Sequence, residues 1–523
     1  MKIFIRLLII LVFVACEKKQ APKVVVVPKP IITKEGRIIP IDSSKIASFK
    51  DSSMIAFYQA IKNKTFWLAN TDRKKLISLL KNADDEGLFL KDFDIKHIQS
   101  SEENIQQLAD SLLINYDILL TENLNRYIKR ASKGYLNPDS LYTNWDLNPN
   151  NINFKKLLLN FQKKDSFNYA VKAVLPNHIV YKKLKEALQI INKLPKYDLN
   201  KIEIEQKLVL NDTNEVLIDI KKHLIFWKDL HSLDTITPIY NEETELAVKK
   251  FQMRHGLATD GVIGIGTVQA LNFTKEERKK EIIINMERWR WFPRNFEAEY
   301  LIINIPDYTL HVVKNADTIK TNKVITGKAA RKTPVLSSKL SYLVFNPTWT
   351  IPPTILKNDV IPAARRDISY FKNKNITVYN ASNQIVNANN WSAEKAKSYR
   401  YVQSPGKSNA LGLVKFMFPN RFSVYLHDTN SRGYFDKDIR ALSSGCIRVQ
   451  YPFELAEYLL DDAEKWNLDA INKVVDNYKT VNVSFKKDIY IHVLYWTAWS
   501  ENGVLQFRDD LYNYDLELYK NLY

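Results

Sequence analysis

The hydrophobic pattern changes its period part-way along this chain of 523 residues. Between Ile46 and Trp227 apolar residues recur at steps of three and four, as amphipathic helices require. From the stretch "EIIINMERWRWFPRNF" onward they alternate or run in strand-length segments. Helices and strands that are segregated along a chain form separate layers or domains. The sequence therefore predicts a multidomain α+β protein.

The helical half is clearest in "LLINYDILLTENLNRYIKRASKG". Its apolar residues fall on one helical face, and Gly134 provides a stop. They are Leu113, Tyr116, Leu120, Leu124 and Tyr127. We interpret this stripe as core. A shorter segment, Tyr240 to Asn272, predicts a small helical hairpin with a tight turn at Asp260-Gly261.

The strand-rich half contains one strong hairpin signal, Asn502-Gly503, after an alternating run that starts at Ile489. Between Pro352-Pro353 and Gly412 lies a polar, basic and less periodic stretch that we interpret as an inserted lid. Trp289 and Trp291 alternate with arginines and are expected to pack between domains.

The N-terminus, "MKIFIRLLIILVFVAC", has a basic start, an apolar run and a small residue before Cys16. This pattern indicates an export signal, since the run is shorter than the ~20 residues of a membrane-spanning helix. Its ending resembles a bacterial lipobox, in which cleavage leaves Cys16 as the lipid-bearing first residue. The alternative is a plain secretory signal with an incidental cysteine. The polar, proline-spaced segment that follows predicts a tether.

The net charge of +18 falls to +16 without residues 1–15, which carry Lys2, Arg6 and no acid. Such a charge suits a polyanionic neighbourhood. Export argues against nucleic acid and favours acidic cell-wall polymers or membrane surfaces. The histidines show no metal-ligand spacing with one another or with cysteine, so no zinc site, other metal or cofactor is expected.

If Cys16 carries a lipid, Cys446 has no partner for an internal disulfide. It lies in "LSSGCIRVQYP", nineteen residues after His427. A hairpin is expected to bring the imidazole to the sulfur, as general base to nucleophile. Arg448 falls on the same face of an extended segment, where it would favour a thiolate or grip a substrate carboxylate.

The alternatives at this site are a cysteine that is only a buried small hydrophobe and a surface histidine. Asp428 either orients His427 or caps the surface. Gly445 allows a tight turn that offers backbone N–H groups to an oxyanion.

These residues carry a resemblance. "HDT", the nineteen-residue step and "SSGCIRV" resemble the catalytic signature of L,D-transpeptidases of the YkuD fold. "RKTPVLSSKLSYLVFNPTWTIPPTI", "QSPGKSNALGLVKF" and "FRDDLYNYD" resemble the multidomain YcbB-type murein transpeptidases, and "AVKKFQMRHGLATDGVIGIGTVQALN" is similar to a peptidoglycan-binding repeat. The likeness covers most of Ile46 to Asp515.

The expected organisation combines the pattern with this resemblance. It is a lipoprotein signal at 1–15, a tether at 16–45, a helical scaffold domain at 46–230, a small helical peptidoglycan-binding-like module at 231–275, and a β-rich YkuD-like catalytic domain at 276–523 with its lid at about 354–412.

The resemblance implies an enzyme that joins peptidoglycan tetrapeptide stems by 3→3 crosslinks through a thioester, with release of the terminal D-alanine. The implied nucleophile is Cys446 and the general base His427. The oxyanion site falls around Ser444, Gly445 and the Cys446 N–H. Arg448 corresponds to the family's arginine, and carbapenems are expected inhibitors. Trp349 and Trp391 are expected to wall the stem channel, with core packing as the alternative.

Two other functions stay open. A thiol L,D-carboxypeptidase or endopeptidase would use the same chemistry with water as acceptor. A noncatalytic lipoprotein would anchor the envelope through residues 240–272. A papain-like or NlpC-type hydrolase is disfavoured because those enzymes place the cysteine before the histidine. In each case we expect a cell-envelope protein facing the periplasm, held at the inner or the outer membrane by its lipid.

Overall fold

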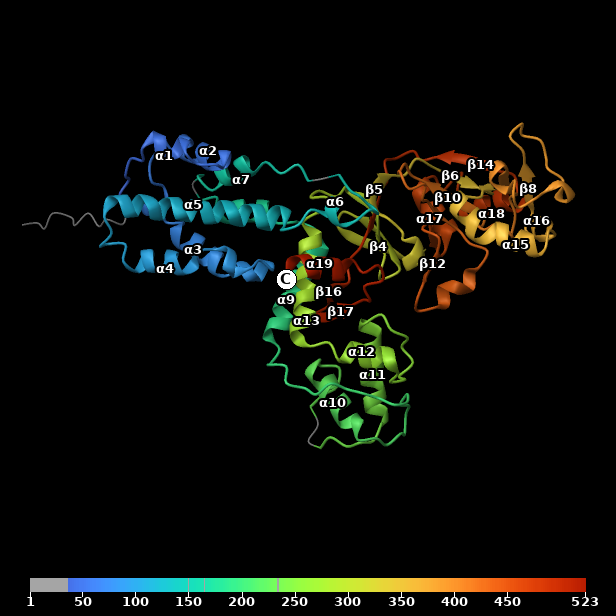
Figure 1. Ribbon diagram of the computed structural model, residues 1–523, viewed down its shortest axis with the longest axis horizontal. Helices are drawn as coiled ribbons and strands as arrows, with labels where there is room; N and C mark the ends of the chain where they lie inside the picture. Colours follow the sequence, from blue (N-terminus) through green and yellow to red (C-terminus); the bar gives the residue numbers. More distant parts are fainter. Residues whose placement is uncertain (1–35, 149, 164, 233–234) are drawn as a thin grey trace, which may run out of the picture.

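The structure is a computed structural model that describes residues 36–523 apart from 149, 164 and 233–234. The expected signal, Cys16 and most of the tether lie outside the described residues. The body is elongated, with helices at one end, a sheet at the other and a small helical unit projecting from the middle (Figure 1).

A first hydrophobic core is built by helices between residues 39 and 174. They are α1 (Ser43–Ala47), α2 (Ser52–Ala60), α3 (Arg73–Lys81), α4 (Ile95–Glu103), α5 (Asp110–Lys133), α7 (Phe154–Asn160) and α8 (Phe167–Val174). The central helix α5 buries Leu113, Leu120 and Leu124 and ends at Gly134, where φ is 85°. This confirms the helix expected from "LLINYDILL".

The next helices join the second core, which they share with the sheet. They are α6 (Pro138–Leu141), α9 (Ile179–Lys193), α10 (Val216–Phe226), α11 (Glu242–Arg254), α12 (Ile265–Leu271) and α13 (Lys275–Trp289). The small unit in Figure 1 contains α10 as well as α11 and α12, so it extends to the N-terminal side of residue 231.

One expectation in this region is wrong. Residues 281–289, which we read as the start of the strand pattern, are helical in α13. The helix begins with a capping box, in which Thr274 and Glu277 satisfy each other's backbone N–H groups. The apolar run is helical because it is buried almost all round between α9, α19 (Tyr514–Leu522) and β16 (Ala498–Glu501).

The large sheet has the strand order β1-β5-β15-β2-β3-β4-β13-β11-β10-β6-β14, with β12 paired to β4. Its strands are β1 (Trp145–Asp146), β2 (Glu299–Asn304), β3 (Thr309–Lys314), β4 (Asp317–Gly327), β5 (Val335–Lys339), β6 (Tyr342–Phe345), β10 (Val414–Met417), β11 (Leu426–His427), β12 (Ala441–Ser443), β13 (Ile447–Val449), β14 (Val481–Ser484) and β15 (Tyr490–Leu494). Helices α17 (Pro452–Leu460) and α18 (Leu468–Asp476) contribute Leu455 and Ile471 to its core.

The Asn502-Gly503 turn joins β16 to β17 (Val504–Phe507), and both turn residues have positive φ, 52° and 75°. This is the backbone that a two-residue type I′ hairpin needs, so the hairpin prediction is confirmed.

The segment from Trp349 to Gln403, which includes the inserted stretch after Pro352, has a core and a sheet of its own. Its elements are β7 (Trp349–Thr350), α14 (Pro353–Ile355), a π-helical turn (Leu356–Val360), α15 (Ile361–Arg366), α16 (Tyr370–Asn373), β8 (Ile376–Tyr379) and β9 (Arg400–Gln403). Ile351, Val360, Phe371 and Tyr401 fill the space between them. The candidate lid is therefore a folded subdomain at the outer end of the sheet (Figure 1).

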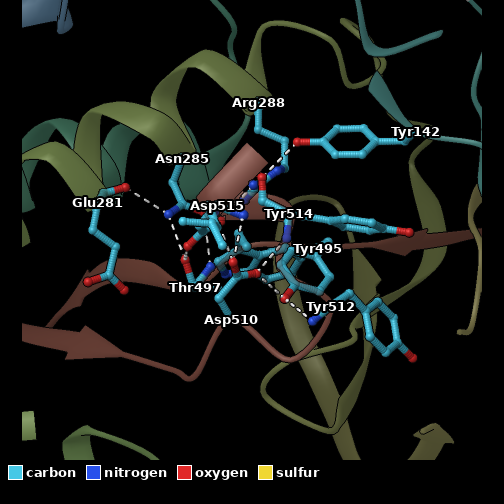
Figure 2. A network of polar contacts seen from close by, with 12 residues as sticks. Tyr142, Glu281, Asn285, Arg288, Tyr495, Thr497, Asp510, Tyr512, Tyr514 and Asp515 are labelled. Carbon is cyan, nitrogen blue, oxygen red and sulfur yellow. Dashed lines mark hydrogen bonds and ion pairs between the residues drawn. The ribbon is translucent and has the colours of Figure 1, made fainter. Parts of the chain in front are cut away.

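A buried polar network ties α13 to the C-terminal segment (Figure 2). The Arg288 side chain is fully buried and donates to Asp515 at 2.6 Å and to Asn285 at 3.0 Å. Asn285 also contacts Thr497, whose hydroxyl donates to Asp515. Trp289 and Trp291 are buried beside this network, in agreement with their expected role in packing.

Within the described part of the chain, no helix combines the length and the apolar character that crossing a membrane requires.

Candidate active site

His427 and Cys446 are brought together by neighbouring strands. His427 is the last residue of β11, and Cys446 immediately precedes β13. The two strands pair in parallel, with Leu426 opposite Ile447 and His427 opposite Arg448. The expected hairpin is therefore wrong: residues 428–446 cross over through β12 on β4, and a direct turn cannot connect parallel strands.

The turn before Cys446 requires glycine. Gly445 is buried with φ at 115°, in the region that side chains rarely adopt. Its N–H donates to Ser443 Oγ at 3.1 Å, and its carbonyl accepts from Thr333 at 2.9 Å. Among the described residues, the N–H groups of Ser444 and Cys446 have no acceptor. Of the three expected oxyanion donors, the Gly445 N–H is thus already engaged.

The His427 imidazole is 4% exposed and is held by the backbone. Its Nδ1 bonds to the carbonyl of Asp428. The Asp428 carboxylate instead accepts from the Leu413 N–H at 2.9 Å and from Arg432. Asp428 therefore orients the ring through its backbone, while its side chain fixes the loop before β10.

Burial keeps both candidate groups neutral. It lowers the pKa of His427 to about 3, and the positive charge of Arg448 acts in the same direction, against the contacts to the Asp428 and Leu411 backbone. Burial also raises the pKa of the Cys446 thiol, although hydrogen bonds from Tyr425 and the charge of Arg448 oppose it. Arg448 favours the thiolate, as expected, but desolvation outweighs this attraction and the pKa of the thiol is raised.

Arg448 follows Cys446 by two residues, and one hydrogen-bonding edge of its guanidinium is unused. Within the described part of the chain its buried Nε has no partner, and burial lowers the pKa of the guanidinium. Burying a guanidinium without a carboxylate partner costs free energy of desolvation, and a bound anion would offset that cost. The arrangement is thus suited to a ligand carboxylate.

A cavity of about 660 Å³ contains most of the expected site residues. Cys446, His427, Arg448, Ser444 and Trp349 all line it. Trp391 does not: its indole N–H donates to Tyr401 at 2.8 Å inside the lid, where it packs on Phe371. The structure therefore places Trp391 in the lid core.

Tyr425 is a site residue that we did not select from the sequence. Its side chain hydrogen-bonds both the Cys446 sulfur and Trp349, and its ring centroid lies 5.6 Å from that of His427. The signal was present in "SVYLH", where strand alternation puts Tyr425 and His427 on one face.

A second omission, Arg331, connects the lid to the catalytic loop. Its Nη1 donates to Asp359 of the lid at 2.8 Å and to Ser444 Oγ at 2.7 Å.

Comparison with protein families identifies this part of the chain. Residues 298–475 match the L,D-transpeptidase catalytic domain of the YkuD family. The chain carries an L,D-transpeptidase domain. Residues 52–188 match a family described as "Scaffold domain", and residues 213–271 one described as "Putative peptidoglycan binding domain". The protein thus combines a helical scaffold, a small peptidoglycan-binding-type unit and a β-rich YkuD domain.

A curated relative from Haemophilus influenzae, "Putative L,D-transpeptidase", is 35% identical over 242 residues, which are 46% of this chain and 49% of the relative. The chain thus spans about half the length of the relative it matches.

Two solved structures similar to this chain were also found. One, an L,D-transpeptidase from Stackebrandtia nassauensis, is 14% identical, covers 59% of this chain and 100% of its own, and has a TM-score of 0.22. The other, LdtMt1 in complex with imipenem, is 14% identical, covers 38% and 59%, and has a TM-score of 0.19.

The thiol of the L,D-transpeptidase domain is expected to react slowly with iodoacetamide near neutral pH. Because burial raises its pKa above the ordinary 9.0, the alkylation rate is expected to climb only at pH values above 9. Mass spectrometry of the peptide that contains Cys446 measures this rate. The same peptide in urea, where burial is lost, is expected to react several-fold faster at pH 8. A folded-state midpoint at or below pH 8.5 would contradict the prediction.

Proposed function

We propose that this protein is an L,D-transpeptidase that forms 3→3 crosslinks between peptidoglycan stems through an acyl-enzyme on Cys446. The observation that carries the proposal is the common cavity in which Cys446, His427 and Arg448 meet on paired strands. The L,D-transpeptidase match of residues 298–475 supports the reaction class.

In the first proposed half-reaction, the Cys446 sulfur attacks the carbonyl of the third stem residue, a diaminopimelate. His427 takes the thiol proton and returns it to the departing amine of D-alanine. The bond from Nδ1 to the Asp428 carbonyl favours the tautomer that leaves Nε2 free to accept a proton. The new C–S bond replaces the C–N bond, and D-alanine leaves.

Backbone donors stabilise the tetrahedral oxyanion in this scheme. The N–H groups of Ser444 and Cys446 are the candidates, since the Gly445 N–H is bonded to Ser443. Arg448 binds a stem carboxylate with its free edge. Trp349 walls the stem channel, and Tyr425 steadies the sulfur.

In the second half-reaction, the side-chain amine of another stem attacks the thioester and frees the thiol. A transferase needs this site partly closed, so that amine rather than water resolves the acyl-enzyme. The lid that carries Pro352, Thr354 and Ile355 to the cavity edge is the proposed closure element. Carbapenems are the proposed acylating inhibitors, because a nucleophilic thiol can open a β-lactam ring and keep the acyl group as a thioester.

We further propose that the protein works in the periplasm-facing cell envelope, anchored by a lipid on Cys16. The peptidoglycan-acting families matched by the chain support the envelope location. Metabolic labelling with a palmitate analogue is expected to mark the wild-type protein, whereas Cys16→Ala, which removes the acceptor thiol, is expected to stay unlabelled.

Product analysis separates transfer from hydrolysis. Purified protein incubated with disaccharide tetrapeptide is expected to give crosslinked dimer and free D-alanine, because the amine of a second stem competes with water for the thioester. Mass spectrometry distinguishes the dimer from the disaccharide tripeptide that water would produce. Tripeptide without dimer would replace the transferase by a carboxypeptidase, and no product from either route would favour the noncatalytic anchor.

A further inference from the structure

A second groove lies on the large sheet, away from the cavity that contains Cys446. It has a volume of about 430 Å³. Its floor is formed by Tyr300, Ile302 and Asn304 of β2 with His311 of β3, and its walls by the start of α9 and the β16–β17 hairpin. No step of the proposed transpeptidation uses these residues.

The groove is electrically balanced. Its charged residues are paired with each other, Arg508 with Asp307 at 2.6 Å and Lys183 with Glu501. Burial lowers the pKa of His311, so its imidazole is neutral at pH 7. Because its charged residues form ion pairs, the groove favours an uncharged polar ligand. The net positive charge of the whole chain would instead attract anionic polymers.

Asn304 provides an unused hydrogen-bond donor at the floor. The residue is 1% exposed. Its Oδ1 accepts from the Trp496 N–H at 3.1 Å, which fixes the orientation of the amide. Among the described residues Nδ2 has no acceptor. A buried amide donor without a partner is destabilising, and a ligand carbonyl would satisfy it.

An aromatic wall stands beside this donor. The indole of Trp499 lines the groove, and the Arg508 guanidinium lies 4.8 Å from its ring centre and holds it in place. Gln506 adds a neutral amide. An aromatic plane beside neutral hydrogen-bonding groups suits a sugar ring, which is apolar on its C–H face and polar at its edge.

Strand register puts the groove and the catalytic cavity on one face of the sheet. His311 pairs with Thr321, Ile325 of the same strand pairs with Arg448, and Arg448 pairs with His427. Residues directly opposite each other point to the same face. Across the sheet, His311 and Arg448 are separated by two strand spacings, which is about 10 Å. Along the strand direction they are separated by four residues, which is about 13 Å.

We propose that this groove binds N-acetylated sugar residues of the glycan strand, so that the attached stem extends along the sheet toward Cys446. The combined offset is about 16 Å. An extended stem of four residues spans about 13–14 Å, and the lactyl link adds to it. That the ligand is the glycan strand of peptidoglycan rests on the proposed function, whereas saccharide binding as such rests on the groove alone.

The test is calorimetric titration of the full chain with a tetramer of β-1,4-linked N-acetylglucosamine, which carries no peptide. Saturable binding to the wild type is expected. Trp499→Ala and Gln506→Ala are each expected to weaken it, the former about tenfold, the scale of one lost aromatic contact. Val504→Ala changes the same hairpin at an exposed position that does not line the groove, and is expected to bind like the wild type.

Kinetics distinguish this proposal from the catalytic one. Trp499→Ala is expected to raise KM for disaccharide tetrapeptide and leave KM for the sugar-free tetrapeptide unchanged, which also verifies that the variant is folded. Cys446→Ala is expected to retain saccharide binding. Absence of binding to the wild type, or equal binding by Trp499→Ala, would overturn the groove proposal even if crosslinking is observed. Binding without any acyl transfer would retain the groove and remove the proposed enzyme.

Discussion

Cys446→Ala is expected to abolish acylation by a carbapenem and to lower crosslinking by at least about 10⁴-fold, because the variant lacks the atom that forms the covalent intermediate. Intact-protein mass spectrometry reports the adduct directly. The wild-type protein is expected to gain the mass of one inhibitor molecule, and the variant none. Since Cys446 is half-buried at a cavity wall, the variant is expected to remain folded.

The chain offers its own matched control, because it contains one other cysteine. Cys16→Ala is expected to be acylated like the wild type, since residue 16 plays no part in the proposed chemistry. Unaltered acylation in Cys446→Ala would remove the proposed nucleophile. Loss of acylation in both variants would point to a common effect on folding, which a thermal unfolding scan would show.

Asp515→Ala is expected to destabilise the protein by about 3–5 kcal/mol, because it leaves the Arg288 guanidinium buried without its counter-ion. The Arg288 side chain is 0% exposed and Asn285 cannot neutralise its charge. Asp510 also attracts this charge but, among the described residues, makes no hydrogen bond to the guanidinium. Thr497 also loses an acceptor. Since this network joins α13 to the C-terminal segment (Figure 2), the calorimetric transition of the body is expected to move to lower temperature.

Two further variants calibrate that result. Asp515→Asn keeps the shape and an acceptor oxygen but removes the charge, and is expected to cost less than Asp515→Ala. Glu203→Ala breaks an ion pair with Lys201 whose side chains are 78% and 74% exposed. Its effect is expected to stay within about 1 kcal/mol, as for exposed pairs generally. Equal shifts for Asp515→Ala and Glu203→Ala would contradict the role assigned to the buried network.

Local patterns predicted the elements that depend on local physics. The apolar face and terminal glycine of α5 and the Asn502-Gly503 turn are set by residues within a few positions of each other. The helix α13 was misread because a long apolar run fits a strand or a buried helix equally well. Its capping box was the signal that favours the helix.

The sequence predicted which residues form the candidate site, but it did not predict the strand pairing that positions them. His427, Cys446 and Arg448 come from one motif, but the parallel pairing of β11 with β13 depends on β12, which docks on a strand more than a hundred residues earlier. The raised pKa of Cys446 also depends on contacts between residues that are far apart in the sequence. Its desolvation comes from distant segments, including Ala329–Lys332 and the lid, which no local pattern reveals.

Because adjacent parallel strands hold His427 and Arg448 in register, the length of the chain between them is free to vary. Insertions among the exposed residues 436–439 would lengthen this crossover, while the strand register kept the spacing of His427 and Arg448. The crossover is therefore the segment whose length can change without moving the two strands that hold these side chains.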